Sequence, residues 1–167
     1  MDKKPHFIKA TSFGLYEDSL ATAINLFKFH GIKRLSRPLG SLLLDHDMHG
    51  IDALVPVPLS IRSLRKRGFN QSLLLAHTIA RTRNLRIISD GLIKKTETPP
   101  QLGLPAKHRL KNTRGAFRAV KNFSGMRVLL IDDVMTTGAT ANECSRQLLT
   151  AGADEVSVLT LARSSML

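Results

Sequence analysis

Hydrophobic residues along this chain recur with two different periods. Short aliphatic runs are typical of strands that are buried on both faces, and the strand candidates of this kind are 52–58, 127–131 and 156–162. Elsewhere apolar residues recur every three to four positions, as on one face of a helix, and the helix candidates are 16–29, 35–44, 70–83 and 140–150. Strands that alternate with helices favour right-handed crossovers and parallel pairing. The pattern predicts an α/β fold of three layers, with a mostly parallel twisted sheet between helices on both faces.

Shorter segments complete the predicted organisation. Additional strand candidates are 7–10, 85–88, 91–94 and 116–120, and Ser12 to Gly14 is expected to form a turn. In the 70–83 helix the apolar stripe is expected to consist of Leu73, Leu74, His77 and Ala80, with His77 as a polar neighbour of the core. A single domain is predicted, in which a strand and helical region at 1–50 packs on a core at 51–167. Residues 95–115 are rich in Pro, Thr, Lys and Arg and predict a long flexible loop.

Composition narrows the class of protein. The 167 residues are 43% hydrophobic, as in an ordinary globular domain. No apolar run approaches the roughly 18 residues that span a bilayer, and no signal peptide is apparent. Cys144 is the one cysteine, so no internal disulfide can form, which agrees with a cytoplasmic protein. This residue is expected to be a small buried hydrophobe on the last helix rather than a nucleophile.

Positive charge is concentrated in the middle of the chain. The formal net charge is +12, and residues 61–127 carry 16 basic against 2 acidic side chains. The two flanking regions together are close to neutral. Such asymmetry indicates a polyanionic partner, and both a pyrophosphate group and a nucleic acid satisfy this requirement.

Residues 128–140 hold the most informative chemistry. They read VLLIDDVMTTGAT, which is an aliphatic strand, two acids, a loop of small hydroxyl residues and the start of a helix. The carboxylates of Asp132 and Asp133 can accept hydrogen bonds from vicinal hydroxyls. The backbone N–H groups of Thr136 to Thr140, at a helix N-terminus, favour a phosphate, and Gly138 allows the backbone to approach it closely. The combination predicts a site for a phosphorylated sugar.

Other interpretations of this stretch are weaker. A buried strand that merely ends in acids does not account for the Thr-Thr-Gly-Ala-Thr loop. A Walker B strand also reads as aliphatics followed by acids, but it requires a G-x-x-x-x-G-K-[ST] loop, and the chain contains no Gly-Lys pair. A receiver-type acidic pocket would place its acids near the start of the chain, whereas here they lie near its end.

Two stretches resemble a known family. Residues 128–140 are similar to the phosphoribosyl-pyrophosphate (PRPP) signature of type I phosphoribosyltransferases. Residues 55–71, which read VPVPLSIRSLRKRGFNQ, resemble the hallmark of the competence-associated ComF branch, with lesser similarity at 27–31 and 109–117. The resemblance runs from about residue 16 to 163 and implies the type I phosphoribosyltransferase fold. ComF proteins usually begin with a four-cysteine zinc segment, which this chain lacks, so no zinc site is carried over.

The resemblance implies a role for each part of the two stretches. It implies that the catalytic pair, Asp132 and Asp133, binds the ribose hydroxyls. The same two acids would bind Mg²⁺ through water or substrate. The residues implied for the 5′-phosphate are Met135, Thr136, Thr137, Gly138, Ala139 and Thr140. The turn after Pro58 corresponds to a pyrophosphate site, with Leu59, Ser60 and Ile61. In that setting guanidinium groups suit the leaving group, and the candidates are Arg62, Arg65 and Arg67. A solvated basic turn is the alternative for these three residues.

The 95–115 loop has two interpretations. Its basic residues and those beside it could form a lid over the substrate, and the candidates are Lys94, Lys95, Arg109 and Arg114. A flexible, soluble loop is the alternative.

Two main functions are compatible with the sequence. The first is an enzyme that transfers phosphoribosyl from PRPP to an unidentified acceptor, with Mg²⁺ as cofactor and release of pyrophosphate. The second is a non-catalytic protein that binds single-stranded DNA during uptake, and a PRPP sensor is a third.

With one Tyr and no Trp, the chain is poor in stacking residues, although phosphate contacts need none. No stretch reads as a hood for a nucleobase. Similar enzymes are often dimers, so a homodimer is one expectation.

Overall fold

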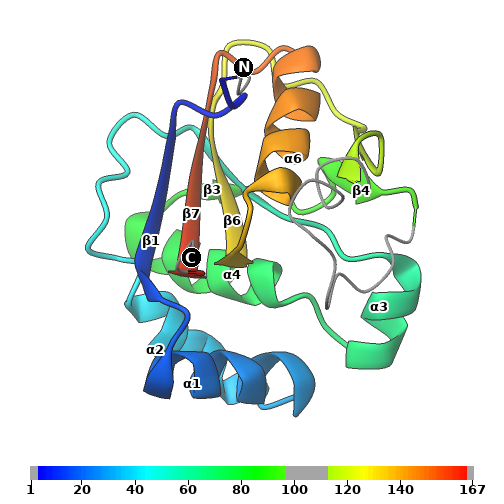
Figure 1. Cartoon of the computed structure of the whole chain (residues 1–167). Coiled ribbons are helices and arrows are strands. Elements are labelled where there is room, and N and C mark those ends of the chain that lie inside the picture. Colours follow the sequence, from blue (N-terminus) through cyan, green and yellow to red (C-terminus); the bar gives the residue numbers. More distant parts are fainter. Residues whose placement is uncertain (1–3, 97–112, 165–167) are drawn as a thin grey trace.

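Five parallel strands form the centre of the molecule (Figure 1). The computed structural model describes residues 4–96 and 113–164. The strands, in their order across the sheet, are β1 (Lys9–Leu15), β7 (Glu155–Arg163), β6 (Arg127–Met135), β2 (Ala53–Pro56) and β3 (Arg86–Ile87). All four pairings between neighbours are parallel. The predicted parallel sheet is confirmed.

Helices cover both faces of this sheet, as the hydrophobic pattern predicts. They are α1 (Asp18–Phe29), the 3₁₀ helix η1 (Lys33–Leu35), α2 (Ser36–Ser41), α3 (Ile61–Arg67), α4 (Gln71–Arg83) and α6 (Ala139–Thr150). Successive residues of a strand point to opposite faces, so Val128 and Leu130 of β6 pack with α6 while Leu129 and Ile131 pack with α1, α2 and α4. None of the helices in the described ranges is long and apolar enough to cross a membrane.

A separate hairpin lies beside the main sheet. Strands β4 (Leu92–Lys94) and β5 (Phe117–Ala119) pair antiparallel, and Leu92 and Phe117 join the core on the α6 side. Figure 1 shows β4 next to α6. The segment between these strands contains residues 97–112, so most of the predicted 95–115 loop lies outside the described residues.

Three local predictions are wrong. Strand β6 does not end before the acids but continues through Asp132 and Asp133 to Met135, because its pairing with β7 persists to the end of both strands. The predicted turn at Ser12 to Gly14 lies inside β1, which pairs with β7 over this stretch. The basic segment after Ser60 forms α3 rather than a turn. Ser60 caps this helix, since its Oγ accepts a hydrogen bond from the Ser63 N–H at 3.2 Å.

The buried face of α4 also differs from the predicted stripe. Leu75, Ala76 and Ile79 are fully buried, whereas His77 is exposed. Three consecutive leucines at 73–75 make the helical phase ambiguous in sequence, and the structure selects the stripe that includes Leu75. In α6 the prediction holds: Cys144 is fully buried, and burial raises the pKa of its thiol well above the usual range.

Candidate functional site

A cavity of about 490 Å³ lies at the carboxyl edge of the sheet. Ligands of open α/β sheets bind at this edge, and Figure 1 shows the arrowheads of β6 and β7 pointing toward the end of the molecule that holds α1 and α3. The lining comes from the segment before α1, α1 itself, the loop after β2, α3, the start of α4, the β4–β5 hairpin, the end of β6, the start of α6 and the residue after β7. Its residues are Tyr16, Lys28, Phe29, Val57, Pro58, Leu59, Ser63, Arg67, Gln71, Ser72, Lys94, Phe117, Asp132, Asp133, Val134, Thr136, Thr140 and Ser164.

The two acids of β6 are held by different partners. Both carboxylate oxygens of the buried Asp133 contact the Nζ of Lys28 in α1, at 3.0 and 2.9 Å. The Oδ1 of Asp132 accepts hydrogen bonds from the Ser72 hydroxyl at 3.1 Å and from the Asp133 N–H at 2.9 Å. Each carboxylate is therefore oriented by groups far away in the sequence as well as by its own strand.

The environment of Asp132 disfavours its charge. Burial, and then the neighbouring Asp133 carboxylate, raises the pKa of Asp132 to about 7, although Lys28 and the hydrogen bonds from Asp133 and Ser72 act in the opposite direction. Asp132 therefore loses its proton less readily than an ordinary aspartate. A ligand that donates hydrogen bonds to it favours the ionised form.

The small-residue loop forms a second, smaller hollow next to the acids. Its volume is about 30 Å³, and the lining includes all six residues predicted for the 5′-phosphate, namely Met135, Thr136, Thr137, Gly138, Ala139 and Thr140. Gly138 has φ of 74°, a left-handed conformation that glycine adopts without strain. Helix α6 begins directly after it, so its positive dipole end faces the hollow. Thr136 and Thr140 line both hollows.

The residues predicted for pyrophosphate separate into two groups. Leu59 and Arg67 line the large cavity. Ser60 is buried as the cap of α3, and the side chains of Ile61, Arg62 and Arg65 are exposed on this helix away from the cavity lining.

Of the four predicted lid residues, one lines the large cavity. Lys94 lines the cavity, and its Nζ lies 5.5 Å from the ring centroid of Phe117. Lys95 and Arg114 are exposed and do not line the cavity, and Arg109 lies outside the described residues.

Sequence reasoning missed the wall that α1 contributes. Lys28 and Phe29 of α1 line the cavity together with Tyr16, which precedes this helix, and Phe29 is 66% exposed. The Arg67 guanidinium lies 5.3 Å from the centroid of the Phe29 ring. The similarity at 27–31 was the signal in this region, because it contains both Lys28 and Phe29.

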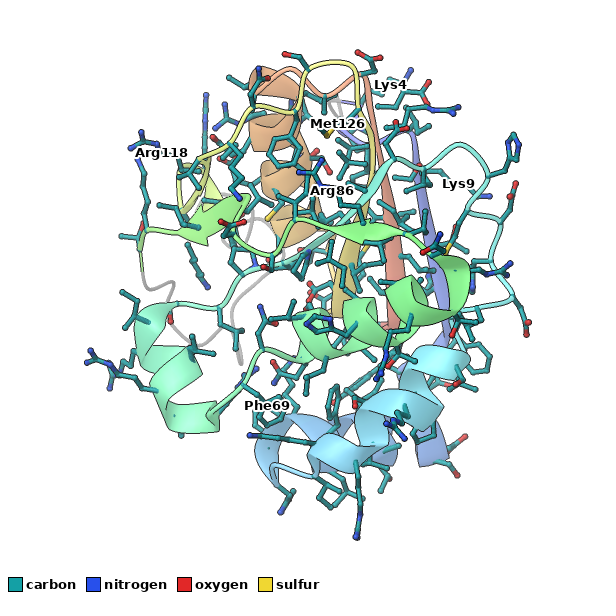
Figure 2. All side chains as sticks on the ribbon, turned by 180° about the vertical axis from the view of Figure 1, so that it is seen from behind. Lys4, Lys9, Phe69, Arg86, Arg118 and Met126 are labelled. Carbon is teal, nitrogen blue, oxygen red and sulfur yellow. The ribbon has the colours of Figure 1, made fainter. Side chains whose placement is uncertain are left out.

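An aromatic pair fixes this wall against the basic helix. Phe69, between α3 and α4, packs on Phe27 of α1 with ring centroids 5.6 Å apart. Figure 2 shows Phe69 from behind, at the junction of α3 with the N-terminal helices. Packing of Phe69 therefore positions α1, and with it Lys28, over the carboxyl edge.

The acids suit a metal that is held mainly by substrate. Within residues 4–96 and 113–164, no group of three or more His, Cys, Asp or Glu side chains could hold a metal ion. Magnesium is commonly bound by one or two carboxylates together with water and substrate phosphates. Asp132 and Asp133 fit this mode and do not by themselves form a complete metal cage.

One protein family and several known proteins are similar to this chain. The family described as phosphoribosyl transferase domain matches residues 54–165. Competence protein F of Haemophilus influenzae is 34% identical over 175 residues, which cover 98% of this chain and 76% of that protein. DNA utilization protein YhgH of Escherichia coli K12 is 32% identical, with the same coverage of both chains. Competence protein ComFC of Bacillus subtilis is 33% identical, over 89% of this chain and 62% of that protein.

Proposed function

The chain belongs to the phosphoribosyl transferase domain family and to the group of competence protein F, and on this basis we propose that it binds PRPP and transfers the phosphoribosyl group to an acceptor. The acceptor is unidentified, and the second product is pyrophosphate. The observation that carries this proposal is the meeting of two features at one sheet edge. An acidic pair that can hold a diol lies directly beside a helix N-terminus that can hold a phosphate.

Ligand binding would use the two hollows together. The 5′-phosphate would accept hydrogen bonds from the N–H groups and hydroxyls of the Thr136 to Thr140 loop. Ribose hydroxyls would donate hydrogen bonds to Asp132 and Asp133. The cationic side chains in the lining of the large cavity, Arg67 and Lys94, are suited to the diphosphate oxygens.

Transfer would proceed by displacement at the anomeric carbon. The bond from this carbon to the diphosphate oxygen breaks, the diphosphate leaves with the electron pair, and the acceptor forms the new bond and loses a proton. Positive charge that develops on the ribose would be stabilised by the two carboxylates, so catalysis would rest on position and electrostatics. Bound Mg²⁺ would supply charge neutralisation on the diphosphate.

Removal of the acidic pair tests the proposal. In Asp132→Asn with Asp133→Asn, we expect PRPP affinity to fall at least about a hundredfold, because neutral amides no longer hold the diol or the metal. Calorimetry with PRPP in the presence of Mg²⁺ measures this, and a chelator should weaken binding to the wild type. Asp90→Asn is the control, since Asp90 is exposed, pairs with Lys121 on the surface and does not line the cavity. Undiminished affinity in the double variant would contradict the assignment of these acids.

A second measurement separates an enzyme from a sensor. The wild type is incubated with PRPP and a cellular extract that supplies acceptors, and pyrophosphate release is followed. We expect release that the double variant does not support. Tight PRPP binding without release above the background of the extract would favour the sensor.

Binding of single-stranded DNA is a second candidate function. Arg62, Arg65 and Lys66 are exposed on α3, outside the cavity. They therefore present positive charge to the surroundings rather than to a ligand in the cavity. All three relatives named above carry names that refer to competence or DNA utilization, which favours a nucleic acid as the polyanion on this helix.

A further inference from the structure

Strand β1 is an edge strand of the main sheet. It stands at one end of the strand order, and among the described residues it pairs with β7 alone. Figure 1 shows it at the outer side of the sheet. The strand at the opposite edge, β3, has two residues, whereas β1 has seven. Short strands are one way in which proteins protect a sheet edge, so β3 is protected and β1 is open to pairing.

The backbone of β1 presents hydrogen-bonding groups to this open side. The N–H of Ile8, just before the strand, donates to the Val156 carbonyl at 2.9 Å. In a parallel ladder the backbone groups of alternate residues point to the same side, so every second residue from Ile8 faces β7. The N–H and C=O groups of Lys9, Thr11 and Phe13 point away from it. No strand in the described ranges pairs with them, and such an edge is a template for another strand.

One face of β1 carries exposed apolar side chains and part of a hollow. Successive residues of a strand point to opposite faces, so Lys9, Thr11, Phe13 and Leu15 share one face. In the first half of the strand, Lys9 and Thr11 line a cavity of about 190 Å³. The apolar residues in its lining are Ile8, Ile51, Leu129, Val158 and Leu159. In the second half, Phe13 and Leu15 are 46% and 48% exposed. Projecting apolar groups and a hollow that can receive them therefore occupy opposite halves of one strand.

We propose that β1 binds a second copy of this chain, with the two β1 strands paired antiparallel about a two-fold axis at Ser12. Thr11 then lies opposite the partner's Phe13, and Lys9 opposite the partner's Leu15, so residues with outward backbone groups face one another. Phe13 and Leu15 of each copy are placed beside the hollow of the other, as a self-complementary two-fold interface requires. This inference goes beyond the proposed function and does not depend on PRPP binding.

The charges at the two ends of β1 favour the antiparallel arrangement. Lys4 and Lys9 lie at its start, and Glu17 and Asp18 follow its end. Antiparallel pairing brings the start of one strand to the end of the other, so basic groups meet acidic groups, whereas parallel pairing would bring like charges together. The net charge of +12 opposes association, but residues 1–60 carry 7 basic and 6 acidic side chains. A second copy can therefore approach this edge without strong repulsion.

Sedimentation equilibrium of the whole chain measures the association. We expect the wild type to form, with rising concentration, a species of twice the chain mass. Phe13→Lys places a charge on the apolar face of the free edge, which natural edge strands use against pairing, and should weaken association at least about tenfold. Ile93→Lys is the matched control, because Ile93 is 41% exposed on β4, on the other side of the molecule from β1 (Figure 1). It should associate like the wild type.

A cross-link tests the register of the two strands. The proposed axis places Ser12 opposite the partner's Ser12, as a pair that exchanges no backbone hydrogen bonds, with Cα atoms about 4.5 Å apart. This distance is within the range of a disulfide, so Ser12→Cys should form a covalent dimer under mild oxidation. The native Cys144 is fully buried, and the wild type should stay uncross-linked. Ser41→Cys is the control, because Ser41 is exposed on α2.

Three results would overturn this interface. The first is a wild type that remains monomeric up to about 100 μM. The second is association that Phe13→Lys leaves unchanged, because the contact would then use another surface. The third is equal cross-linking of Ser12→Cys and Ser41→Cys, which indicates random collision. Circular dichroism of Phe13→Lys should match that of the wild type, since Phe13 is exposed, and the cross-link tests the same interface without this substitution.

Discussion

Lys28 is a cation in direct contact with the acidic pair. Its ammonium contacts both oxygens of Asp133, and its positive charge opposes the effects that raise the pKa of Asp132 to about 7. Lys28 and Asp133 lie 105 positions apart, so local sequence patterns do not predict their contact. The acids themselves were predictable, because two carboxylates directly follow an aliphatic run, but the cation that pairs with them was not.

The contact with Lys28 predicts how ligand binding depends on pH. Binding of PRPP that requires ionised Asp132 strengthens as pH rises through about 7, since the carboxyl group loses its proton there. In Lys28→Met the opposing positive charge is lost, so the pKa of Asp132 rises and the increase in affinity should occur at higher pH. Calorimetry with PRPP across this pH range measures the midpoint. Lys121→Met is the control, because Lys121 pairs with Asp90 away from the cavity. An unshifted midpoint in Lys28→Met would contradict this coupling.

Helix α4 is the element that connects the core to the site. Its buried face packs on the sheet, while its first turn brings Gln71 and Ser72 to the cavity. Asn70 fixes where the helix begins and also ties it to the loop after β2 through the Val57 carbonyl. The position of the first turn therefore depends on one side chain that uses both its acceptor and its donor.

Substitutions at this cap should separate the two contacts. Asn70→Ala removes both, and we expect the free energy of unfolding to fall by about 1–2 kcal/mol. Asn70→Asp keeps an acceptor for the N–H groups of Ser72 and Leu73 but loses the donor to Val57, so its loss should be smaller. Urea unfolding measures both values. Equal losses in the two variants would show that the contact with Val57, rather than the cap, stabilises this junction.

The accuracy of sequence interpretation varied among elements for physical reasons. Buried parallel strands and the α6 stripe are specified by local hydrophobicity, and both were predicted. The end of β6 was not, because its backbone pairing with β7 continues where the side chains become polar. The phase of α4 was ambiguous at three consecutive leucines. The wall formed by α1 depends on the packing of Phe69 on Phe27, a tertiary contact that has no local signature.

The whole molecule divides its positive charge between an interior and an exterior location. Arg67 and Lys94 line the cavity, whereas Arg62, Arg65 and Lys66 are exposed on α3. The concentration of charge in residues 61–127 therefore does not have a single explanation. Arg67 and Lys94 would serve the proposed anionic ligand of the cavity, and the exposed face of α3 remains available to an extended polyanion.

Variants of these two sets should affect different ligands. We expect Arg62→Gln with Arg65→Gln and Lys66→Gln to weaken binding of single-stranded oligo(dT) and to flatten its dependence on salt. Each lost phosphate contact reduces the slope of log affinity against log salt concentration by about 0.7. PRPP affinity should stay at the wild-type value, because none of the three side chains lines the cavity.

The Asp132→Asn and Asp133→Asn variant supplies the reverse comparison. It should lose PRPP binding and retain the salt dependence of DNA binding. Loss of both ligands in the α3 variant would mean that the helix serves the cavity after all, since a distant surface charge has little effect on a buried site at physiological ionic strength. A wild type whose affinity for oligo(dT) does not change with salt would instead exclude phosphate neutralisation by α3, and the charge of this helix would then need another explanation.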